Sequence, residues 1–220
     1  MPTSHYLQIN EIIQIVKYVA PSSVLDIGIG YGKYGMLLRE YLKFWAPIDD
    51  LNVRTGTIDG IEAFESYITP GQKYYYDSIY IGNALDILPN LQRYDLILLI
   101  DVLEHLDVEA GTRLLTLCQK KASHILISTP IKMNVQGTIY GNDYEIHRYQ
   151  WKPKDFERLP NSARRTNYKS LIYLIGKDSK KIITNIKLEN FKVYINYQFP
   201  RLTNFLVNIK NSFRNQQPKH

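Results

Sequence analysis

The chain has 220 residues, 45% of them hydrophobic, which suits one sizeable domain with a substantial core. It contains no apolar run of about 18 residues, and residues 1–10 lack the order of a secretory signal peptide, so we expect neither a membrane-spanning helix nor a leader. The single cysteine, Cys118, excludes an internal disulfide and predicts a core thiol in a cytoplasmic protein.

The net charge of +6 is unevenly distributed along the chain. Residues 179–220 carry eight Lys and Arg against the single Glu189, whereas residues 1–178 carry 19 basic and 20 acidic side chains. The basic excess therefore belongs to the last fifth of the chain. This argues against a broad nucleic-acid-binding surface on the rest.

The first predicted element is a helix over residues 9–20, whose apolar side chains recur at helical spacing. Residues 24–35 follow, with the sequence Val-Leu-Asp-Ile-Gly-Ile-Gly-Tyr-Gly-Lys-Tyr-Gly. They predict a buried strand, a tight turn and the start of a helix over residues 32–44. Glycine suits such a turn because the backbone needs unusual torsion angles and because a ligand must approach bare N–H groups.

Two alignments of this glycine turn compete. Gly30, Gly32 and Gly35 alone fit a dinucleotide-binding pattern, but that alignment leaves Asp26 inside a strand that should be apolar on both faces. The other alignment places Asp26 at the end of the strand and begins the turn at Gly28. A carboxylate there suits a ligand with an ammonium group or another cationic centre, and it would repel a pyrophosphate.

In the second alignment the turn resembles motif I of the class I S-adenosylmethionine-dependent methyltransferases. The resemblance implies that S-adenosylmethionine is the cofactor and that Asp26 faces its methionine end. Residues 57–62 resemble the second strand of the family, whose terminal acid, here Glu62, would bind both ribose hydroxyls. Residues 79–86 resemble the third-strand motif, in which Asn83 replaces the usual Asp at the adenine and Asp86 is the alternative acid.

Residues 94–106 predict an apolar strand followed by Asp101-Val-Leu-Glu-His-Leu, which resembles small-molecule members of the family. Residues 124–130 predict a fifth strand. The resemblance covers about residues 20–178 and implies a Rossmann-like α/β fold, a mostly parallel seven-stranded sheet with helices on both faces, closed by an antiparallel pair of which only residues 171–176 can be placed. The cofactor site it implies comprises Asp26, Gly28, Gly30, Tyr31, Gly32, Glu62, Asn83, Ala84 and Asp101.

Further helices are predicted around residues 63–68, 108–121 and 153–159. The segment between the fifth strand and the last of these helices, residues 134–151, mixes aromatic and polar side chains where the crevice should open. From Tyr144 to Trp151 it resembles the Tyr-Glu-x-His-x-x-x-Trp segment of bacterial methyltransferases in sugar and cell-surface polysaccharide pathways. This favours a hydroxyl of a small molecule or saccharide as the methyl acceptor.

A hydroxyl acceptor needs a base, and the candidates are His147 and His105. The structural alternatives are a hydrogen bond to the loop backbone for His147 and packing at a helix start for His105. We take His147 as the base. We predict no catalytic metal, because Asp101, Glu104 and His105 have no further carboxylates or histidines at ligand-like spacing nearby.

Two other functions remain open. The 18 tyrosines and the basic tail could engage RNA or a protein as the methyl acceptor, although the one aromatic run, Tyr74-Tyr75-Tyr76, is more typical of a strand start. The chain could also be a non-catalytic binding protein that kept the fold. The acids at positions 26 and 62 argue against a loss of cofactor binding.

Residues 179–220 are predicted to form a basic extension beyond a methyltransferase domain of residues 1–178. Alternating apolar residues over 191–199 predict a half-buried strand. A helical stripe after Pro200 predicts a basic amphipathic helix that packs on its own domain or a second subunit, or lies on an anionic membrane. Its apolar members are Leu202, Phe205, Leu206, Ile209 and Phe213.

Overall fold

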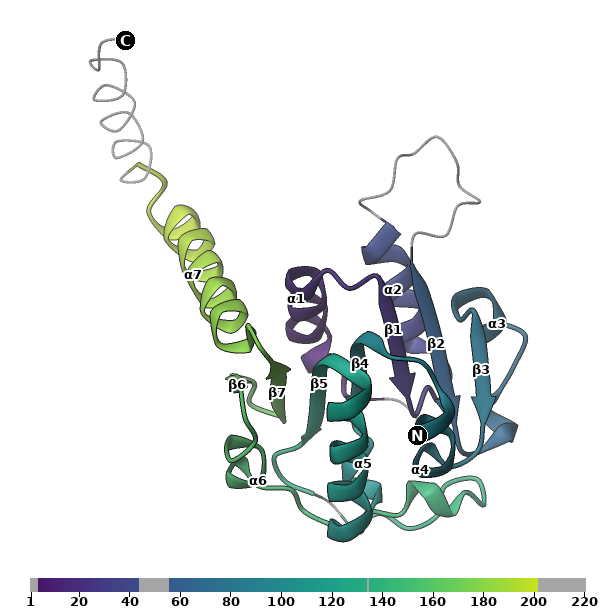
Figure 1. Cartoon of the computed structure of the whole chain (residues 1–220). Helices are drawn as coiled ribbons and strands as arrows, with labels where there is room; N and C mark the ends of the chain where they lie inside the picture. The colour runs from purple at the N-terminus through teal and green to yellow at the C-terminus, as the bar shows by residue number, and fades with distance from the viewer. Residues whose placement is uncertain (1–3, 44–55, 134, 202–220) are drawn as a thin grey trace. The chain divides into compact units, whose positions relative to one another are not determined.

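The computed structural model describes residues 4–43, 56–133 and 135–201 of the chain, and these residues contain one seven-stranded sheet (Figure 1). The strands are β1 (Ser23–Ile27), β2 (Thr57–Glu62), β3 (Ser78–Ile81), β4 (Tyr94–Ile100), β5 (Ala122–Pro130), β6 (Ser162–Arg165) and β7 (Ser170–Gly176). Their order is β3-β2-β1-β4-β5-β7-β6. The first five strands are parallel, and β7 pairs antiparallel with both β5 and β6. The predicted Rossmann-like methyltransferase fold is confirmed.

The helices largely follow the sequence predictions. They are α1 (Ile9–Val19), α2 (Lys33–Lys43), α3 (Gln72–Tyr75), α4 (Ala84–Ile87), α5 (Val108–Lys121), α6 (Pro153–Glu157) and α7 (Ser179–Gln198). The predicted helix over residues 63–68 is a short 3₁₀ turn, Glu65–Tyr67. None of the helices in the described ranges is both long and apolar enough to cross a membrane.

The strand order reverses at β1, and this determines where a ligand can enter. Val24 of β1 pairs with Ile58 of β2 on one side and with Leu96 of β4 on the other. The connections from β1 to β2 and from β3 to β4 therefore run in opposite directions along the sheet. A crevice forms at the carboxyl ends of the strands where such a reversal occurs.

The core is built by strands that are apolar on both faces, as a covered parallel sheet requires. Ile97 and Leu99 of β4 belong to a buried cluster that includes Leu114 and Cys118 of α5. Cys118 is fully buried, and burial raises the pKa of its thiol, so this cysteine is the predicted core thiol.

Trp151 also belongs to this core, and it anchors the segment after β5 to the rest of the domain. Its side chain is 1% exposed, and its Nε1–H donates to the carbonyl oxygen of Leu103 at 2.8 Å. A Cβ on Gly111 of α5 would lie 2.4 Å from Cζ2 of the indole. Glycine at position 111 therefore allows the indole to pack directly on the helix backbone.

Two sequence predictions near the C-terminus need comment. Residues 191–198 are helical, as part of α7, so the predicted strand over 191–199 is wrong. The alternating apolar side chains Phe191, Val193 and Tyr197 are exposed, and a helix satisfies its backbone hydrogen bonds without a partner strand. The member of the closing antiparallel pair that the sequence could not place is β6, which is too short and polar to be recognised from its pattern.

The chain divides into two compact units between Ile183 and Thr184. The first unit contains the whole sheet, and the described part of the second unit contains most of α7. The helix predicted after Pro200 lies outside the described residues. Membrane binding or self-association through it stays a prediction.

Tyr74 and Tyr75 belong to α3 and do not start a strand.

Candidate functional site

A cavity of about 400 Å³ opens at the carboxyl ends of the central strands. Its wall includes Glu62, the last residue of β2. It also includes Gly28 and Asp101, which directly follow β1 and β4. Cavities of roughly 300–1,000 Å³ are typical of small-molecule sites, and the carboxyl ends of the strands are where such folds bind ligands. The cavity is therefore the candidate functional site.

The glycine turn forms one part of the wall. Gly28 has a φ of +78° and Gly30 a φ of +50°, values that few side chains tolerate. The N–H of Gly28 donates to the carbonyl oxygen of Ile61 at 2.8 Å, which joins the turn to β2. A Cβ on Gly28 would lie 2.7 Å from a methyl group of Val102. Gly28, Gly30 and Tyr31, which the sequence predicts to bind the cofactor, line the cavity.

Glu62 connects the glycine turn to the end of β2. Its carboxylate is 6% exposed and accepts hydrogen bonds from the N–H of Gly30 at 2.8 Å and of Phe64 at 2.9 Å. Burial raises the pKa of Glu62, although these two N–H groups act in the opposite direction. Each oxygen uses one lone pair on the backbone, which leaves acceptor capacity for a ligand in the cavity.

Asp26 differs from the prediction, because it does not line the cavity. It is 2% exposed, and the hydroxyl of Tyr76 donates to its Oδ2 at 2.6 Å. The same hydroxyl accepts a hydrogen bond from the N–H of Gly35 at 3.0 Å. Asp26 therefore supports the loop and α2 through Tyr76. Gly32, the other predicted contact missing from the wall, packs on Gln72.

Burial also changes the charge state of Asp26. It raises the pKa of this carboxyl from 3.8 to about 7, with a smaller contribution from the nearby Glu62 and an opposing one from the hydrogen bond of Tyr76. Tyr76 itself is 2% exposed, and burial raises the pKa of its hydroxyl well above the usual value, so it remains a donor. Nothing in the local sequence signals this pairing of residues 50 positions apart.

Asn83 and Ala84 line the cavity at the end of β3, as predicted. The Oδ1 atom of Asn83 caps α4 by accepting a hydrogen bond from the N–H of Leu85 at 2.9 Å. Asp86, the alternative to Asn83 in the sequence, is exposed and does not line the cavity. Asn83 is therefore the better placed of the two side chains for a ligand.

Asp101 follows β4 with a φ of +55° and lines the cavity, as predicted. Its carboxylate accepts hydrogen bonds from Nε2 of the fully buried Gln8 at 2.7 Å and from the hydroxyl of Ser128. The N-terminal segment also contributes Ser4 and His5 to the wall, which the sequence did not reveal.

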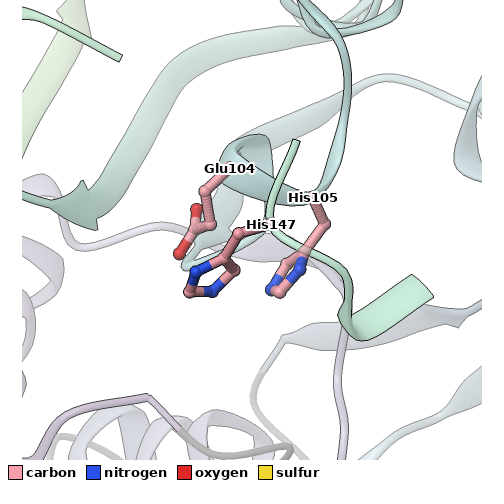
Figure 2. A group of neighbouring side chains, drawn as sticks. All are labelled: Glu104, His105 and His147. Atoms are coloured by element: carbon pink, nitrogen blue, oxygen red, sulfur yellow. The ribbon is translucent and has the colours of Figure 1, made fainter. Parts of the chain in front are cut away.

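The two candidate bases lie next to each other and beside Glu104 (Figure 2). Glu104 and His105 belong to a 3₁₀ turn after β4, Leu103–His105, and His147 comes from the segment after β5. One ligand atom from each of the three side chains lies within 4.8 Å of the others. The imidazole centroids of His105 and His147 are 5.0 Å apart, and all three residues line the cavity.

Backbone hydrogen bonds bring His147 to this position. The N–H groups of Arg148 and Tyr149 donate to the carbonyl oxygen of Glu104 at 2.7 and 3.3 Å, and the N–H of His147 donates to Gln136 at 3.2 Å. Together with the bond from Trp151 to Leu103, they fix the segment on the turn that carries Glu104 and His105. Sequence spacing could not reveal that His147 joins these two residues.

Burial controls the charge of this cluster. It lowers the pKa of His105 to about 4, with a further contribution from the neighbouring His147, so the imidazole is neutral at pH 7. Burial, followed by the nearby Asp101, raises the pKa of Glu104 well above its usual range. Glu145, which the sequence analysis did not select, accepts a hydrogen bond from the hydroxyl of Tyr67 at 3.0 Å on the same wall.

No protein-family model matches the sequence, and no curated protein matches it. Solved structures do match the fold. A protein from Nostoc punctiforme PCC 73102 with a provisional O-methyltransferase name has a TM-score of 0.55 at 17% identity, over 78% of this chain and 57% of that one. The present chain thus spans little more than half the length of the Nostoc protein.

Two further solved structures are matched over a larger share of their own length. The N-terminal domain of EvdMO1, determined in the presence of S-adenosylhomocysteine and D-fucose, has a TM-score of 0.53 at 13% identity, over 79% of this chain and 84% of that one. Magnesium protoporphyrin IX methyltransferase from Synechocystis PCC 6803, with S-adenosylhomocysteine bound, has a TM-score of 0.53 at 15% identity, over 76% and 80%. At such identities the similarity establishes the fold.

Proposed function

The chain has the fold of the class I S-adenosylmethionine-dependent methyltransferases, and from this premise we propose that it methylates a hydroxyl of a small molecule or saccharide. The observation that carries the proposal is that one cavity borders both the glycine turn with Glu62 and the cluster of Glu104, His105 and His147. A cofactor and an acceptor could therefore meet in a single space.

The residues of the cavity fit S-adenosylmethionine. Glu62 has acceptor capacity for the two ribose hydroxyls, and Asn83 with Ala84 lies where the adenine would be bound. Gly28 and Gly30 allow the ligand to approach the backbone. Since Asp26 is behind the wall, we assign the ammonium group of the methionine end to Asp101, which is on it.

When bound, S-adenosylmethionine supplies a methyl group that its sulfonium sulfur has already activated. The cavity must align the acceptor oxygen with that methyl carbon, and such alignment can contribute about 7–11 kcal/mol. His147 would take the proton of the acceptor hydroxyl during the transfer. General base catalysis of this kind is worth roughly 10²–10⁴-fold in rate.

The segment after β5 supports a polar acceptor. Gln136, Asn142, Glu145 and His147 come from this segment and line the cavity. Their amide, carboxylate and imidazole groups suit the hydroxyls of a saccharide, and the EvdMO1 domain of the same fold was determined in the presence of a sugar. The segment can also cover the acceptor and exclude water.

The test is binding followed by transfer. Isothermal titration of the full chain with S-adenosylmethionine and S-adenosylhomocysteine should give saturable heat at a stoichiometry of one. Methyl transfer from radiolabelled cofactor should then be measured on panels of saccharides, small alcohols, RNA and protein. Absence of heat with both nucleosides would refute the cofactor, and transfer to RNA or protein alone would refute the acceptor class.

A further inference from the structure

Three side chains that commonly bind metal ions meet on the cavity wall, and they supply one carboxylate oxygen and two imidazole nitrogens. Figure 2 shows the carboxylate of Glu104 beside the ring of His147, with the ring of His105 next to it. One ligand atom from each residue lies within 4.8 Å of the others, which is close enough for one ion to bridge all three with small side-chain adjustments. We propose that Glu104, His105 and His147 bind a divalent transition-metal ion.

Glu104 supplies the second, independent observation. The residue is 2% exposed, and its Oε2 atom is buried without a hydrogen-bond partner. A buried carboxylate oxygen with no partner is costly, and native structures rarely leave one unexplained. The oxygen belongs to a residue that lines the cavity next to two imidazoles, so a bound cation would satisfy it.

The hydrogen bond of His105 to the backbone leaves one ring nitrogen available as a ligand. The Nδ1 atom of His105 lies 3.3 Å from the carbonyl oxygen of Ile146, and only a protonated Nδ1 can donate to a carbonyl. In the neutral ring this leaves the lone pair on Nε2. A hydrogen bond from the second ring nitrogen to a backbone carbonyl is the usual support of a metal-binding histidine.

The donor set indicates which ions fit. Mg²⁺ and Ca²⁺ prefer oxygen ligands throughout, whereas two imidazoles with one carboxylate suit Zn²⁺, Mn²⁺, Fe²⁺ or Co²⁺. Asp101 lines the same cavity but is not one of the three residues whose ligand atoms lie within 4.8 Å of one another. Three protein ligands would leave coordination positions open toward the cavity, as in catalytic sites.

Binding of the ion does not depend on the proposed function. A role for the ion in methyl transfer does rest on it. A divalent ion held by Glu104, His105 and His147 would lower the pKa of a coordinated acceptor hydroxyl, whose proton would pass to water, and would hold the acceptor oxygen in place. His147 would then act as a ligand and not as the base. The sequence predicts no catalytic metal because it shows Asp101, Glu104 and His105 without further ligands at suitable spacing, and it cannot show that His147 joins them.

The experiment uses the full, untagged chain after treatment with a chelator and removal of the chelator. Co²⁺ is titrated while its visible d–d absorption is recorded, and Mn²⁺ binding is followed from the loss of the free-ion signal in electron paramagnetic resonance. We expect saturation at one ion per chain. Glu104→Gln and His147→Ala should each weaken binding by at least the roughly 10–100-fold that loss of an outer-shell partner costs.

The matched controls are Glu109→Gln and His124→Gln, which remove the same side-chain types at positions that do not line the cavity. Both should bind the ions as the wild type does. Absence of a Co²⁺ spectrum in the wild type, or unchanged affinity in both ligand variants, overturns the proposal. If circular dichroism shows that Glu104→Gln does not fold, the test relies on His147→Ala. His147 is partly exposed, so its replacement should disturb folding less.

Calorimetry with S-adenosylmethionine on the same preparation separates the two proposals. Nucleoside heat without a Co²⁺ spectrum overturns the metal site and leaves the methyltransferase proposal standing. A Co²⁺ spectrum that depends on Glu104 and His147, without nucleoside heat, supports the metal site and refutes the cofactor.

Discussion

Replacing Asp26 by Asn should change how the stability of the protein depends on pH. Burial raises the pKa of this carboxyl from 3.8 to about 7 in the folded protein, so between these values the folded state holds a proton that the unfolded state has lost. The stability that this proton contributes is full below pH 3.8 and is lost as the pH rises through 7. At 1.36 kcal/mol per unit, the loss amounts to about 4 kcal/mol in total and about 3 kcal/mol between pH 5 and pH 8.

The assay is urea unfolding of the wild type and Asp26→Asn at pH 5, 6, 7 and 8, with the free energy of unfolding extrapolated to water. The histidines titrate in both proteins, so the difference between the two free energies isolates Asp26. We expect the wild type to lose about 3 kcal/mol relative to the variant across this range. Asp86→Asn, at an exposed site, should show no such trend. A difference between wild type and Asp26→Asn that is constant with pH would refute the reasoning.

Three further predictions concern the loop and the cavity. Glu62→Ala should weaken S-adenosylmethionine binding by at least about tenfold, because hydrogen bonds to a charged group are worth roughly 1.5–3 kcal/mol, and an unchanged Kd in calorimetry would contradict this role. Gly35→Ala would place a Cβ 2.4 Å from Cζ of Tyr76, and overpacking of this kind costs about 1–3 kcal/mol, which should lower the Tm. Gly137→Ala is the matched control, since nothing lies within 4 Å of its Cβ, and equal melting of the two variants would count against the contact. His147→Ala should reduce turnover by roughly 10²–10⁴-fold with the affinity for S-adenosylmethionine unchanged, whether the imidazole acts as the base or as a metal ligand, and wild-type turnover would exclude both roles.

Much of the fold could be predicted because its signals are local. The strand, turn and helix of residues 23–43 depend on apolar residues followed by closely spaced glycines, and Glu62 ends a short strand that contains Ile58 and Ile61. The parallel strands contain the Ile, Leu and Val residues that identify a strand, and even the four-residue β3 has two isoleucines. In contrast, β6 is four residues of mostly polar sequence and shows itself only by pairing with β7.

The site contains contacts that no local pattern could reveal. Asp26 looks like a ligand residue because it precedes the glycine turn, but Tyr76, 50 residues later, covers it. His147 joins Glu104 only because backbone bonds hold two distant segments together. The residues 191–199 alternate as a strand would, but alternation alone cannot form a strand that lacks a neighbour, and α7 results.

The anchoring of the segment after β5 has a practical consequence for engineering. Its hydrogen bonds to the carbonyl oxygens of Leu103 and Glu104 come from Arg148, Tyr149 and Trp151, which all follow His147 in the chain. Residues 136–145 contribute polar side chains to the cavity wall and precede these three residues. A chimera in which residues 136–145 come from another enzyme could therefore acquire a new substrate range. His147 would remain beside Glu104 in such a chimera.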